Sequence, residues 1–440
     1  MKRCLIIGGG FAGLSTAVNL SEKNLHVNLI EASPKLGGRA YSLQNDKFAD
    51  TYDNGQHILM GCYYETINFL KKINAIDKLE YQDSLQINFV DTKGKTHKLK
   101  SPRYFYPLNL LWGIMNYTAV SFKSRLKIVD FFLDLMCCFD EDFSQMNVAD
   151  WLNQKKQTNE SIKAFWELLG VSALNTTLQN ASAEMFAEVL KRIFLDGSKA
   201  AVILIPKVGL SDLFVEPSVE FIANHSGEVS TSERALKFII EDGKIKRVIT
   251  DKNEYDDFDF VISAISTHAL KKIEFVSNDS STSLKPVMLI TDDRELEYSS
   301  ILNVHLWVKN NPFQGKFYGL IDSKIHWVFN HGKHISITTS AADDFIAKDN
   351  AEILSEFYSE LEKYFPIFNR NLVADFKVVK EKRATFIPDS RASSIRKMIG
   401  SPLPNFVLAG DWIDTGLPST IESAVLSGKL AAEKILFSTI

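Results

Sequence analysis

The chain has 440 residues, of which 45% are hydrophobic and 24% charged, and its formal net charge is −4. This length predicts two or three domains, and the near balance of acidic and basic residues gives no electrostatic reason to expect a nucleic-acid partner. The four cysteines have neither CxxC nor another metal-ligand spacing, so we expect no metal site and no disulfide framework, as in a reducing cytoplasm.

The first elements along the chain predict a nucleotide site. The apolar residues 4–7 indicate a strand buried on both faces, and GGGFAG follows directly, which ends the apolar run too early for a signal peptide. A helix from Ala12 comes next, and then a strand that ends at Glu31. Glycines let the backbone approach a pyrophosphate, unpaired N–H groups at the helix start attract it, and the acid binds ribose hydroxyls. The predicted ligands are Gly8, Gly10, Ala12, Gly13 and Glu31. The alternative is a glycine turn that only packs a helix against a sheet.

The stretch PKLGGRA, residues 34–40, distinguishes FAD from NAD, which share the first motif. It resembles the GG-R signature of the FAD-dependent amine oxidase and phytoene desaturase superfamily. The resemblance implies that FAD is the cofactor, that Gly38 keeps the backbone open and that Arg39 helps to hold the phosphates. The alternative for these residues is a surface turn with a solvated arginine.

Residues 53–57 read DNGQH and place an acid, an amide and a histidine directly before the apolar residues 58–60. They are either a solvated turn or the lining of a site. In the superfamily the segment after GG-R returns past the flavin ring. The resemblance therefore implies that Asp53, Asn54, Gly55, Gln56 and His57 line the ring on its substrate side.

Residues 66–204 have mostly helical patterns and are rich in aromatic residues, nine of which lie between Ser101 and Phe139. The uncharged stretch from Tyr104 to Phe122 contains Pro107 and Gly113, so we expect no membrane span. The basic residues that flank it are Arg103, Lys123, Arg125 and Lys127. Such a pattern is typical of plain core, and it also suits an interfacial patch or a tunnel for a hydrocarbon.

The middle of the chain predicts more strands. Residues 235–241 and 244–250 are expected to pair through Asp242-Gly243, a hairpin signal, and residues 259–264 to return to a parallel sheet. In the superfamily such a meander completes the FAD domain, which implies that the backbone near Val229 reaches the adenine. Further on, strands are expected at 301–308 and 335–339 and a helix at 351–365.

Near the C-terminus, residues 406–409 predict a buried strand that ends at Gly410 and Asp411, and residues 420–432 predict a helix with small residues spaced for close packing. The superfamily closes its FAD site in this way. The resemblance implies that Asp411 lies at the phosphate and ribitol part of FAD, and that the amides of Thr420 and Ile421 face the C2 oxygen of the flavin. The alternative for Asp411 is a simple helix cap. This segment contains no Cys or His, so we expect the FAD to be noncovalent.

Together these segments predict an α/β fold. We expect a discontinuous Rossmann-like FAD-binding domain of the GR2 type, made of residues 1–65, 205–270 and 395–440, and a mixed helical and sheet substrate domain. The substrate-binding domain is expected to consist of residues 66–204 and 271–394.

Three longer stretches make the resemblance more specific: DNGQHILMGCYYETINFL, the PKVGLSDLF run at 206–214, and AGDW…TGLP…TIE. Over its whole length the chain resembles the hydroxysqualene dehydroxylases of bacterial squalene and hopanoid synthesis. The resemblance implies an FAD-dependent oxidoreductase that removes the allylic hydroxyl of a long-chain isoprenoid, hydroxysqualene, to give squalene. The reaction needs hydride from reduced FAD and a proton for the departing hydroxyl. His57 is the first candidate acid, because an unperturbed histidine has a pKa of about 6.5, with Asp53 as its orienting partner or substitute and Glu422 as a further candidate.

Other functions stay open at this point. Phytoene-type carotenoid desaturation uses the same class of apolar substrate. Amine oxidases share the fold and the cofactor, but this chain has no tyrosine beside Trp412 to form the aromatic cage that steers an amine. A scaffold that holds FAD only as a structural group is the non-enzymatic alternative. We expect the protein in the cytoplasm or peripherally on the inner face of the membrane. No second glycine-rich motif identifies the electron donor, and reduced nicotinamide, a flavodoxin and a quinol remain candidates.

Overall fold

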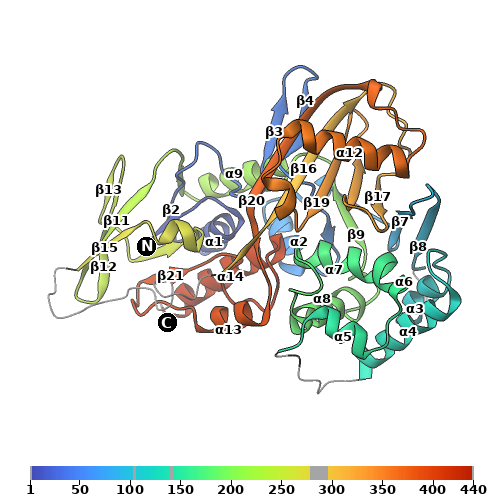
Figure 1. Cartoon of the computed structure of the whole chain (residues 1–440). Coiled ribbons are helices and arrows are strands. Elements are labelled where there is room, and N and C mark those ends of the chain that lie inside the picture. Colours follow the sequence, from blue (N-terminus) through green and yellow to red (C-terminus); the bar gives the residue numbers. More distant parts are fainter. Residues whose placement is uncertain (1, 103–105, 138–142, 144, 278–295, 439–440) are drawn as a thin grey trace.

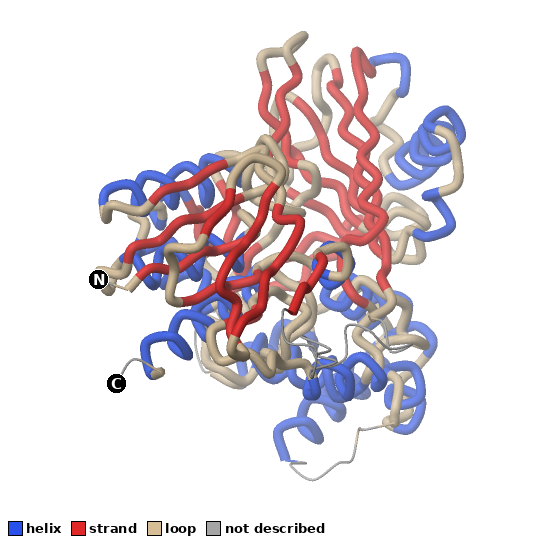
Figure 2. The backbone as a smooth tube through the Cα atoms, turned by 90° about the vertical axis from the view of Figure 1, so that its left-hand side faces the viewer, coloured by secondary structure: helices blue, strands red, loops and turns tan. Residues whose placement is uncertain are grey.

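The computed structural model describes residues 2–102, 106–137, 143, 145–277 and 296–438, so Arg103, Tyr104 and Phe139 of the aromatic stretch lie outside the described residues. Figure 1 shows three parts: a parallel sheet with helices beside it, a large and mostly antiparallel sheet, and a group of helices below the large sheet. In the turned view of Figure 2, the strands form an upper and a left-hand group and most helices lie behind or below them.

The parallel sheet has five strands in the order β10-β2-β1-β14-β21. They come from three separated segments of the chain: β1 (Arg3–Ile7) and β2 (His26–Ile30), β10 (Glu228–Ser230) and β14 (Phe260–Ser263), and β21 (Phe406–Leu408). The central strand β1 is buried from its second residue on, as a strand covered on both faces should be. The predicted α/β fold with a discontinuous parallel sheet is confirmed.

Two long helices pack beside this sheet, α1 (Phe11–Ser21) and α14 (Ile421–Phe437). The Ser15 hydroxyl donates to the carbonyl of Val425 over 2.7 Å. A side chain at Gly428 would lie only 2.3 Å from the Ala12 carbonyl oxygen. The small residues predicted for close packing in the C-terminal helix therefore let the two helix backbones meet. The helices α9 (Glu216–Asn224) and α13 (Ser390–Met398) also belong to this half of the molecule.

A smaller sheet, in the order β13-β12-β11-β15, extends from the parallel sheet. Its strands are β11 (Ala235–Glu241), β12 (Lys244–Thr250), β13 (Glu254–Tyr255) and β15 (Glu274–Ser277). At the turn between β11 and β12, Asp242 has φ +50° and Gly243 has φ +69°. Positive φ at both central residues matches the twist of a two-residue hairpin, and the predicted hairpin is confirmed.

The large sheet has seven strands in the order β20-β16-β19-β18-β17-β7-β8. Its strands are β7 (Gln86–Val90), β8 (Thr96–Lys100), β16 (Tyr298–Val308), β17 (Phe317–Leu320), β18 (Trp327–Asn330), β19 (His334–Ser340) and β20 (Val373–Phe386). The helix α12 (Asn350–Tyr364) shares a core with it. The expectation of mostly helical structure fails for residues 79–100, where β7 and β8 join this sheet. The alternating burial of β8 shows the period of two that the longer helical patterns around it obscured.

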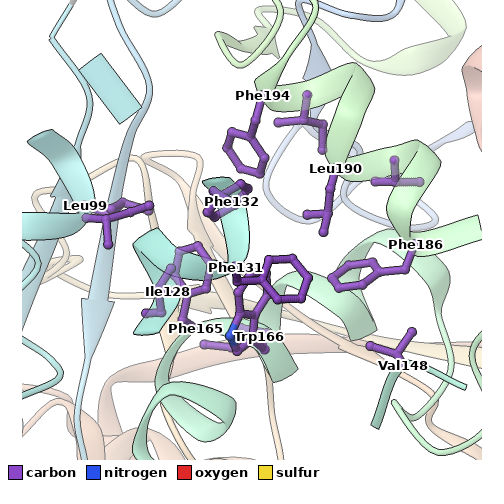
Figure 3. Packing of buried hydrophobic residues seen from close by; sticks show 14 of the residues in the cluster. Leu99, Ile128, Phe131, Phe132, Val148, Phe165, Trp166, Phe186, Leu190 and Phe194 are labelled. Carbon is purple, nitrogen blue, oxygen red and sulfur yellow. The ribbon is translucent and has the colours of Figure 1, made fainter. Parts of the chain in front are cut away.

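The third part is helical. Its helices are α3 (Leu108–Met115), α4 (Phe122–Cys137), α5 (Val148–Gln154), α7 (Glu167–Leu174) and α8 (Ala183–Phe194), whereas α2 (Tyr64–Lys72) shares the core of the parallel sheet. Aromatic rings fill the core between them, and the rings of Phe131 and Trp166 have centroids 4.5 Å apart (Figure 3). Part of the aromatic stretch is thus core. Within the described residues, none of the helices has both the length and the apolar character needed to span a bilayer.

Two small sheets connect these parts. One is the hairpin of β3 (Ser42–Asn45) and β4 (Asp50–Asp53), and the other joins β5 (Leu59–Met60), β9 (Ile203–Pro206) and β6 (Leu79–Tyr81). The DNGQH residues begin at the end of β4 and lead into β5. They therefore lie where the parallel sheet, the large sheet and the helical part meet.

Candidate active site

The glycine loop after β1 brings the start of α1 against the strand. A side chain at Gly13 would lie 1.9 Å from the carbonyl oxygen of Gly8, so only glycine permits this contact. At the buried start of α1, the N–H groups of Phe11, Ala12 and Gly13 donate no hydrogen bond to any described residue. Buried N–H groups rarely stay unpaired, and at a helix start they also carry the positive end of the helix dipole. The loop therefore fits the predicted phosphate.

Glu31 follows β2 and turns toward this loop. Its Oε2 accepts a hydrogen bond of 2.6 Å from the Gly9 N–H, and its Oε1 accepts one of 2.7 Å from the Ser33 N–H. Both oxygens keep free lone pairs, because a carboxylate oxygen can accept more than one hydrogen bond. The predicted ribose ligand thus lies beside the predicted pyrophosphate loop.

Val229 lies in β10, the edge strand of the parallel sheet. The Ser230 carbonyl accepts a hydrogen bond from the Glu31 N–H over 2.8 Å, so the polar groups of Ser230 face β2. Because successive residues of a strand point their backbone groups to opposite sides, the N–H and C=O of Val229 face the edge where no strand pairs. These groups fit the predicted contact with an adenine ring.

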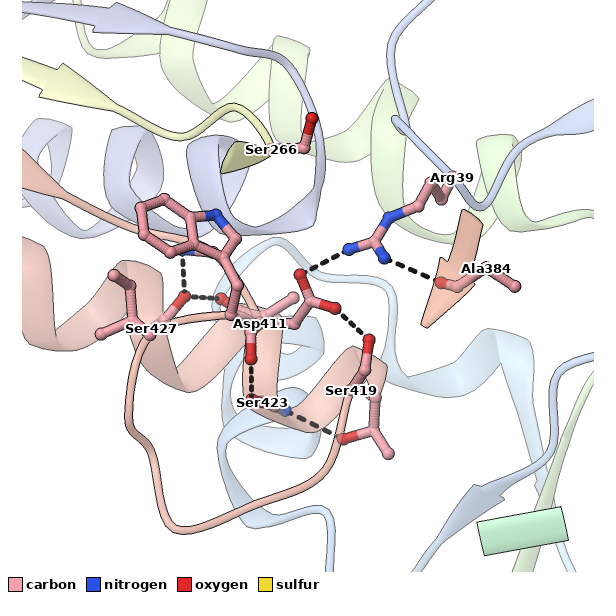
Figure 4. Close-up of polar contacts among 12 residues, drawn as sticks. Arg39, Ser266, Ala384, Asp411, Ser419, Ser423 and Ser427 are labelled. Atoms are coloured by element: carbon pink, nitrogen blue, oxygen red, sulfur yellow. Dashed lines mark hydrogen bonds and ion pairs between the residues drawn. The ribbon is translucent and has the colours of Figure 1, made fainter. Parts of the chain in front are cut away.

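Arg39 and Asp411 form an ion pair next to the start of α14 (Figure 4). Arg39 also donates to the Ala384 carbonyl over 2.7 Å, and the Ser419 hydroxyl donates to the other oxygen of Asp411. The side chain of Asp411 is only 6% exposed, whereas that of Arg39 is 39% exposed and can reach a ligand. Gly38 precedes this arginine with φ +65°, and a side chain there would lie 3.1 Å from the Gly10 Cα. The GG-R turn therefore packs directly on the first glycine loop.

The start of α14 closes the same region. Gly410 has φ +143°, and its N–H donates to the Ser427 hydroxyl over 2.9 Å. The Thr420 side chain caps the helix by accepting from the Ser423 N–H over 3.1 Å. The N–H groups of Ile421 and Glu422 donate to no described residue. They form a second set of unpaired donors at a helix start, which suits electron density on a cofactor.

The Glu422 carboxylate is engaged in hydrogen bonds to a neighbouring helix. Its carboxylate accepts hydrogen bonds from the Glu65 N–H (3.0 Å), the Thr66 N–H (2.8 Å) and the Thr66 hydroxyl (2.7 Å). Both oxygens are engaged at the start of α2, and the residue is only 3% exposed. Glu422 therefore caps α2 from a distant helix, and its role as an acid stays a prediction.

The DNGQH turn is anchored through Asn54. Its side chain accepts from the Tyr41 N–H over 3.0 Å and donates to the Arg39 carbonyl over 2.9 Å, so the turn is tied to the GG-R segment. Asn303 of β16 donates to the Asn54 carbonyl over 3.1 Å. A side chain at Gly55 would lie 3.0 Å from the Asn303 amide and 3.7 Å from the His57 Nε2. The turn is therefore held between the GG-R segment and strand β16 of the large sheet.

Asp53 ends β4 with one oxygen held and the other free. Its Oδ1 accepts from the Ser42 hydroxyl (2.7 Å) and from the Leu210 N–H (2.9 Å). Its Oδ2 has no hydrogen-bond partner in the described part of the chain. Burial raises the pKa of Asp53 to about 6, although its two hydrogen bonds act in the opposite direction. A carboxyl with this pKa is a competent acid near neutral pH.

His57 differs from expectation. Burial lowers its pKa to about 4, so the imidazole is neutral at pH 7. Among the described residues no hydrogen bond joins it to Asp53, whose contacts go to Ser42 and Leu210 instead. Asp53 thus has no hydrogen bond through which it would orient His57, and its other predicted role, as the acid in place of His57, stays a prediction.

Sequence reasoning missed several residues of this region, namely Ser42, Asn303, Ser419 and Ser427. Asn303 could have been found from the sequence, because it is a polar residue between the apolar Leu302 and Val304 of a predicted strand. The three serines had none, since a single serine in a turn or small-residue helix is common.

Residues 11–436 match the family model described as flavin containing amine oxidoreductase. The chain belongs to this flavin amine oxidoreductase family. It is an FAD-dependent oxidoreductase, and the predicted superfamily and cofactor are confirmed. The unpaired N–H groups at the starts of α1 and α14, the Glu31 carboxylate and the exposed edge of Arg39 fit the phosphates, the ribose and the ring of FAD.

Several known proteins match along almost the whole chain. The hydroxysqualene dehydroxylase of Zymomonas mobilis is 27% identical over 98% of this chain and 98% of its own length. The 15-cis-phytoene desaturase of Synechococcus elongatus is 23% identical over 99% of this chain and 96% of its own. An oxidoreductase from Methanosarcina mazei, known from a crystal structure, is 18% identical and superimposes with a TM-score of 0.75 over 98% of this chain and all of its own. The last match shows the fold.

Proposed function

We propose that this enzyme reduces hydroxysqualene to squalene by removing its allylic hydroxyl. The similarity to a hydroxysqualene dehydroxylase over 98% of both chains supports the substrate. The observation that carries the chemistry is the half-buried Asp53, which has a pKa of about 6 and one oxygen without a partner among the described residues. It lies two residues before Gly55, in the turn that Asn54 ties to Arg39.

The reaction exchanges a carbon–oxygen bond for a carbon–hydrogen bond. Reduced FAD, when bound, supplies the hydride for the carbon. The hydroxyl oxygen must take up a proton to leave as water, and the protein must provide that proton away from bulk solvent. In the proposal the protonated Asp53 carboxyl donates through Oδ2, while the Ser42 hydroxyl and the Leu210 N–H hold Oδ1 and stabilise the carboxylate that remains.

The two polar side chains of the turn have different roles in this proposal. His57 is neutral at pH 7, and a neutral imidazole is a very weak acid, so it does not protonate the hydroxyl. Its ring nitrogens have no partner in the described part of the chain, and they are free to bind the hydroxyl and orient it. We therefore assign the proton to Asp53 and substrate positioning to His57.

The direction of electron flow tests the function. Photoreduced enzyme is mixed anaerobically with hydroxysqualene, and in parallel the oxidised enzyme is mixed with phytoene or with a polyamine. We expect the reduced flavin to reoxidise without oxygen as squalene accumulates, and the oxidised flavin to keep its colour in the parallel samples. Bleaching by phytoene or by the amine, with no turnover of the alcohol, would instead establish a desaturase or an amine oxidase.

We also propose that the enzyme contacts the inner surface of the membrane peripherally, through a surface that we call the α3–α4 face. Large apolar side chains gather there with unusual exposure: Leu108 (60%), Trp112 (65%), Phe122 (62%), Leu126 (47%) and Leu133 (45%). The exposed Lys123 lies among them. Exposed apolar side chains next to a basic residue suit the headgroup region of an anionic bilayer, which also dissolves the C30 substrate.

The test uses vesicles that contain anionic phospholipid. Changing Trp112 and Phe122 together to Ser should reduce co-sedimentation with the vesicles, while the flavin spectrum stays unchanged because neither side chain is buried. Ile367→Ser is the matched control, since Ile367 is 69% exposed in the loop after α12 and outside the α3–α4 face. Equal co-sedimentation of all three proteins would refute the membrane contact.

A further inference from the structure

Arg396 is a buried cation that the proposed chemistry does not use. It lies in α13, and the residue is only 1% exposed. Its Nη2 donates to the carbonyl of Ile413 over 2.6 Å, to that of Asp411 over 3.3 Å, and to the Thr415 hydroxyl over 3.4 Å. The guanidinium stacks on the Phe386 ring, 4.6 Å from its centroid. All three acceptors belong to the loop between β21 and α14.

This arginine lacks a direct counter-ion. Within the described residues no carboxylate lies at salt-bridge distance from it, and its Nε and Nη1 have no hydrogen-bond partner. Burial lowers its pKa, and the charges of Asp414 and Asp411 only partly oppose this effect. A buried, incompletely paired cation destabilises a fold, so its presence needs a benefit other than the stability of the empty protein.

The loop that Arg396 holds carries much of the cofactor site. The Asp411 side chain forms an ion pair with Arg39, and its main-chain carbonyl accepts a hydrogen bond from Arg396. Two guanidinium groups therefore hold this one residue. The Thr415 hydroxyl lies 2.7 Å from the Ser423 hydroxyl in the first turn of α14. A shift of this loop would therefore move both the Asp411 carboxylate and the helix start with its unpaired N–H groups.

We propose that Arg396 is a positioning residue for FAD. It holds the loop from Asp411 to Thr415 in the shape that binds the cofactor, and its uncompensated charge favours the negatively charged cofactor in this half of the molecule. The proposal rests on the FAD site and not on the identity of the substrate.

The experiment measures FAD binding to apoprotein by fluorescence titration, together with the thermal unfolding of the apoprotein. Arg396→Met should raise the Kd for FAD at least tenfold, whereas the Tm of the apoprotein should change little, because the removal of a costly buried charge offsets the loss of three hydrogen bonds. Arg247→Met is the control: Arg247 lies in β12 with its side chain 43% exposed, and both quantities should stay as in the wild type.

Arg396→Lys separates charge from geometry. It keeps the cation but cannot span the same acceptors, so we expect weaker FAD binding than in the wild type and a midpoint potential of the bound flavin close to the wild-type value. In Arg396→Met the midpoint potential should be more negative. A change of less than tenfold in Kd for Arg396→Met, or, if that variant does not fold, wild-type FAD affinity in Arg396→Lys, would overturn the proposal.

Discussion

The Arg39–Asp411 region and the DNGQH turn are both proposed to line the cofactor, but they differ in how their polar groups are hydrogen-bonded. Around Asp411, both carboxylate oxygens have partners, and the neighbouring Ser423 and Ser427 are bonded as well. In the turn, Asp53 Oδ2 and the His57 ring lack partners among the described residues. The polar groups proposed to bind FAD are thus already held by hydrogen bonds within the fold. The groups proposed for the chemistry have no hydrogen-bond partner among the described residues.

The two titratable groups of the DNGQH turn also have shifted pKa values. Burial moves the pKa of Asp53 up to about 6 and that of His57 down to about 4, toward the neutral form of each group. Shifts of this kind are typical of functional sites, where a group must change its protonation state. The comparison leads to five predictions, from the largest expected effect to the smallest.

Asp53→Asn should lower the turnover of hydroxysqualene by roughly 10²–10⁴, because the amide cannot supply a proton. FAD binding should stay unchanged, since Asp53 contacts Ser42 and Leu210 and not the Arg39–Asp411 region. Single-turnover reoxidation of the reduced flavin measures the rate. Asp46→Asn, an exposed acid in the turn of the same hairpin, is the control. A loss of less than tenfold would remove Asp53 as the acid.

The pH dependence of the rate distinguishes the two acids. If Asp53 with its pKa of about 6 donates the proton, the rate should rise roughly fiftyfold from pH 8 to pH 6 and then less than about twofold down to pH 5. If His57 with its pKa of about 4 were the acid, the rate would keep rising nearly tenfold between pH 6 and pH 5. Stopped-flow reoxidation at a series of pH values checks this.

Arg39→Met should weaken FAD binding about tenfold to a hundredfold, because it removes a charged donor and leaves the buried Asp411 carboxylate unpaired. Titration of apoprotein with FAD measures the effect. Arg3→Met removes an exposed ion pair with Asp257 on the same sheet and should leave the affinity unchanged. Equal affinities in both variants would show that the pair with Asp411 does not shape the site.

Glu422→Ala should lower the free energy of unfolding by about 2 kcal/mol, because three hydrogen bonds at the start of α2 lose their acceptor. Glu422→Gln should show a smaller loss, since one oxygen remains. Denaturant unfolding provides the measurement. Should the rate fall a hundredfold while stability is unchanged, Glu422 would return as a candidate acid.

His305→Phe should reduce the pH dependence of stability by about 1 kcal/mol between pH 7 and pH 5.5. Burial and the neighbouring His334 lower the pKa of His305 well below its usual range. As the pH falls below about 6.5, the unfolded chain takes up the proton and the folded chain does not, so the wild type loses stability. Urea unfolding at both pH values measures the slope, and identical slopes in the two proteins would contradict the shift.

Local patterns in the sequence were sufficient for the nucleotide half of the fold. The apolar run before GGGFAG, the acid at Glu31, the Asp242-Gly243 turn and the C-terminal helix each depend on residues a few positions apart, and backbone geometry alone constrains them. The same reasoning missed β7 and β8, whose partners lie far along the chain in β17. The exact boundaries of the two domains stay a prediction.

The roles of single side chains were decided by tertiary contacts. Glu422 caps a helix 357 residues earlier in the chain, and Asp53 is held by Leu210, so neither partner was visible in the local sequence. In the aromatic stretch, Phe131 is buried and Trp112 is exposed, although both lie in helices rich in large apolar residues. Burial, pKa and hydrogen-bond partners depend on which distant segments pack against a residue, whereas the sequence by itself determines the local backbone and the type of cofactor that its glycine loops can hold.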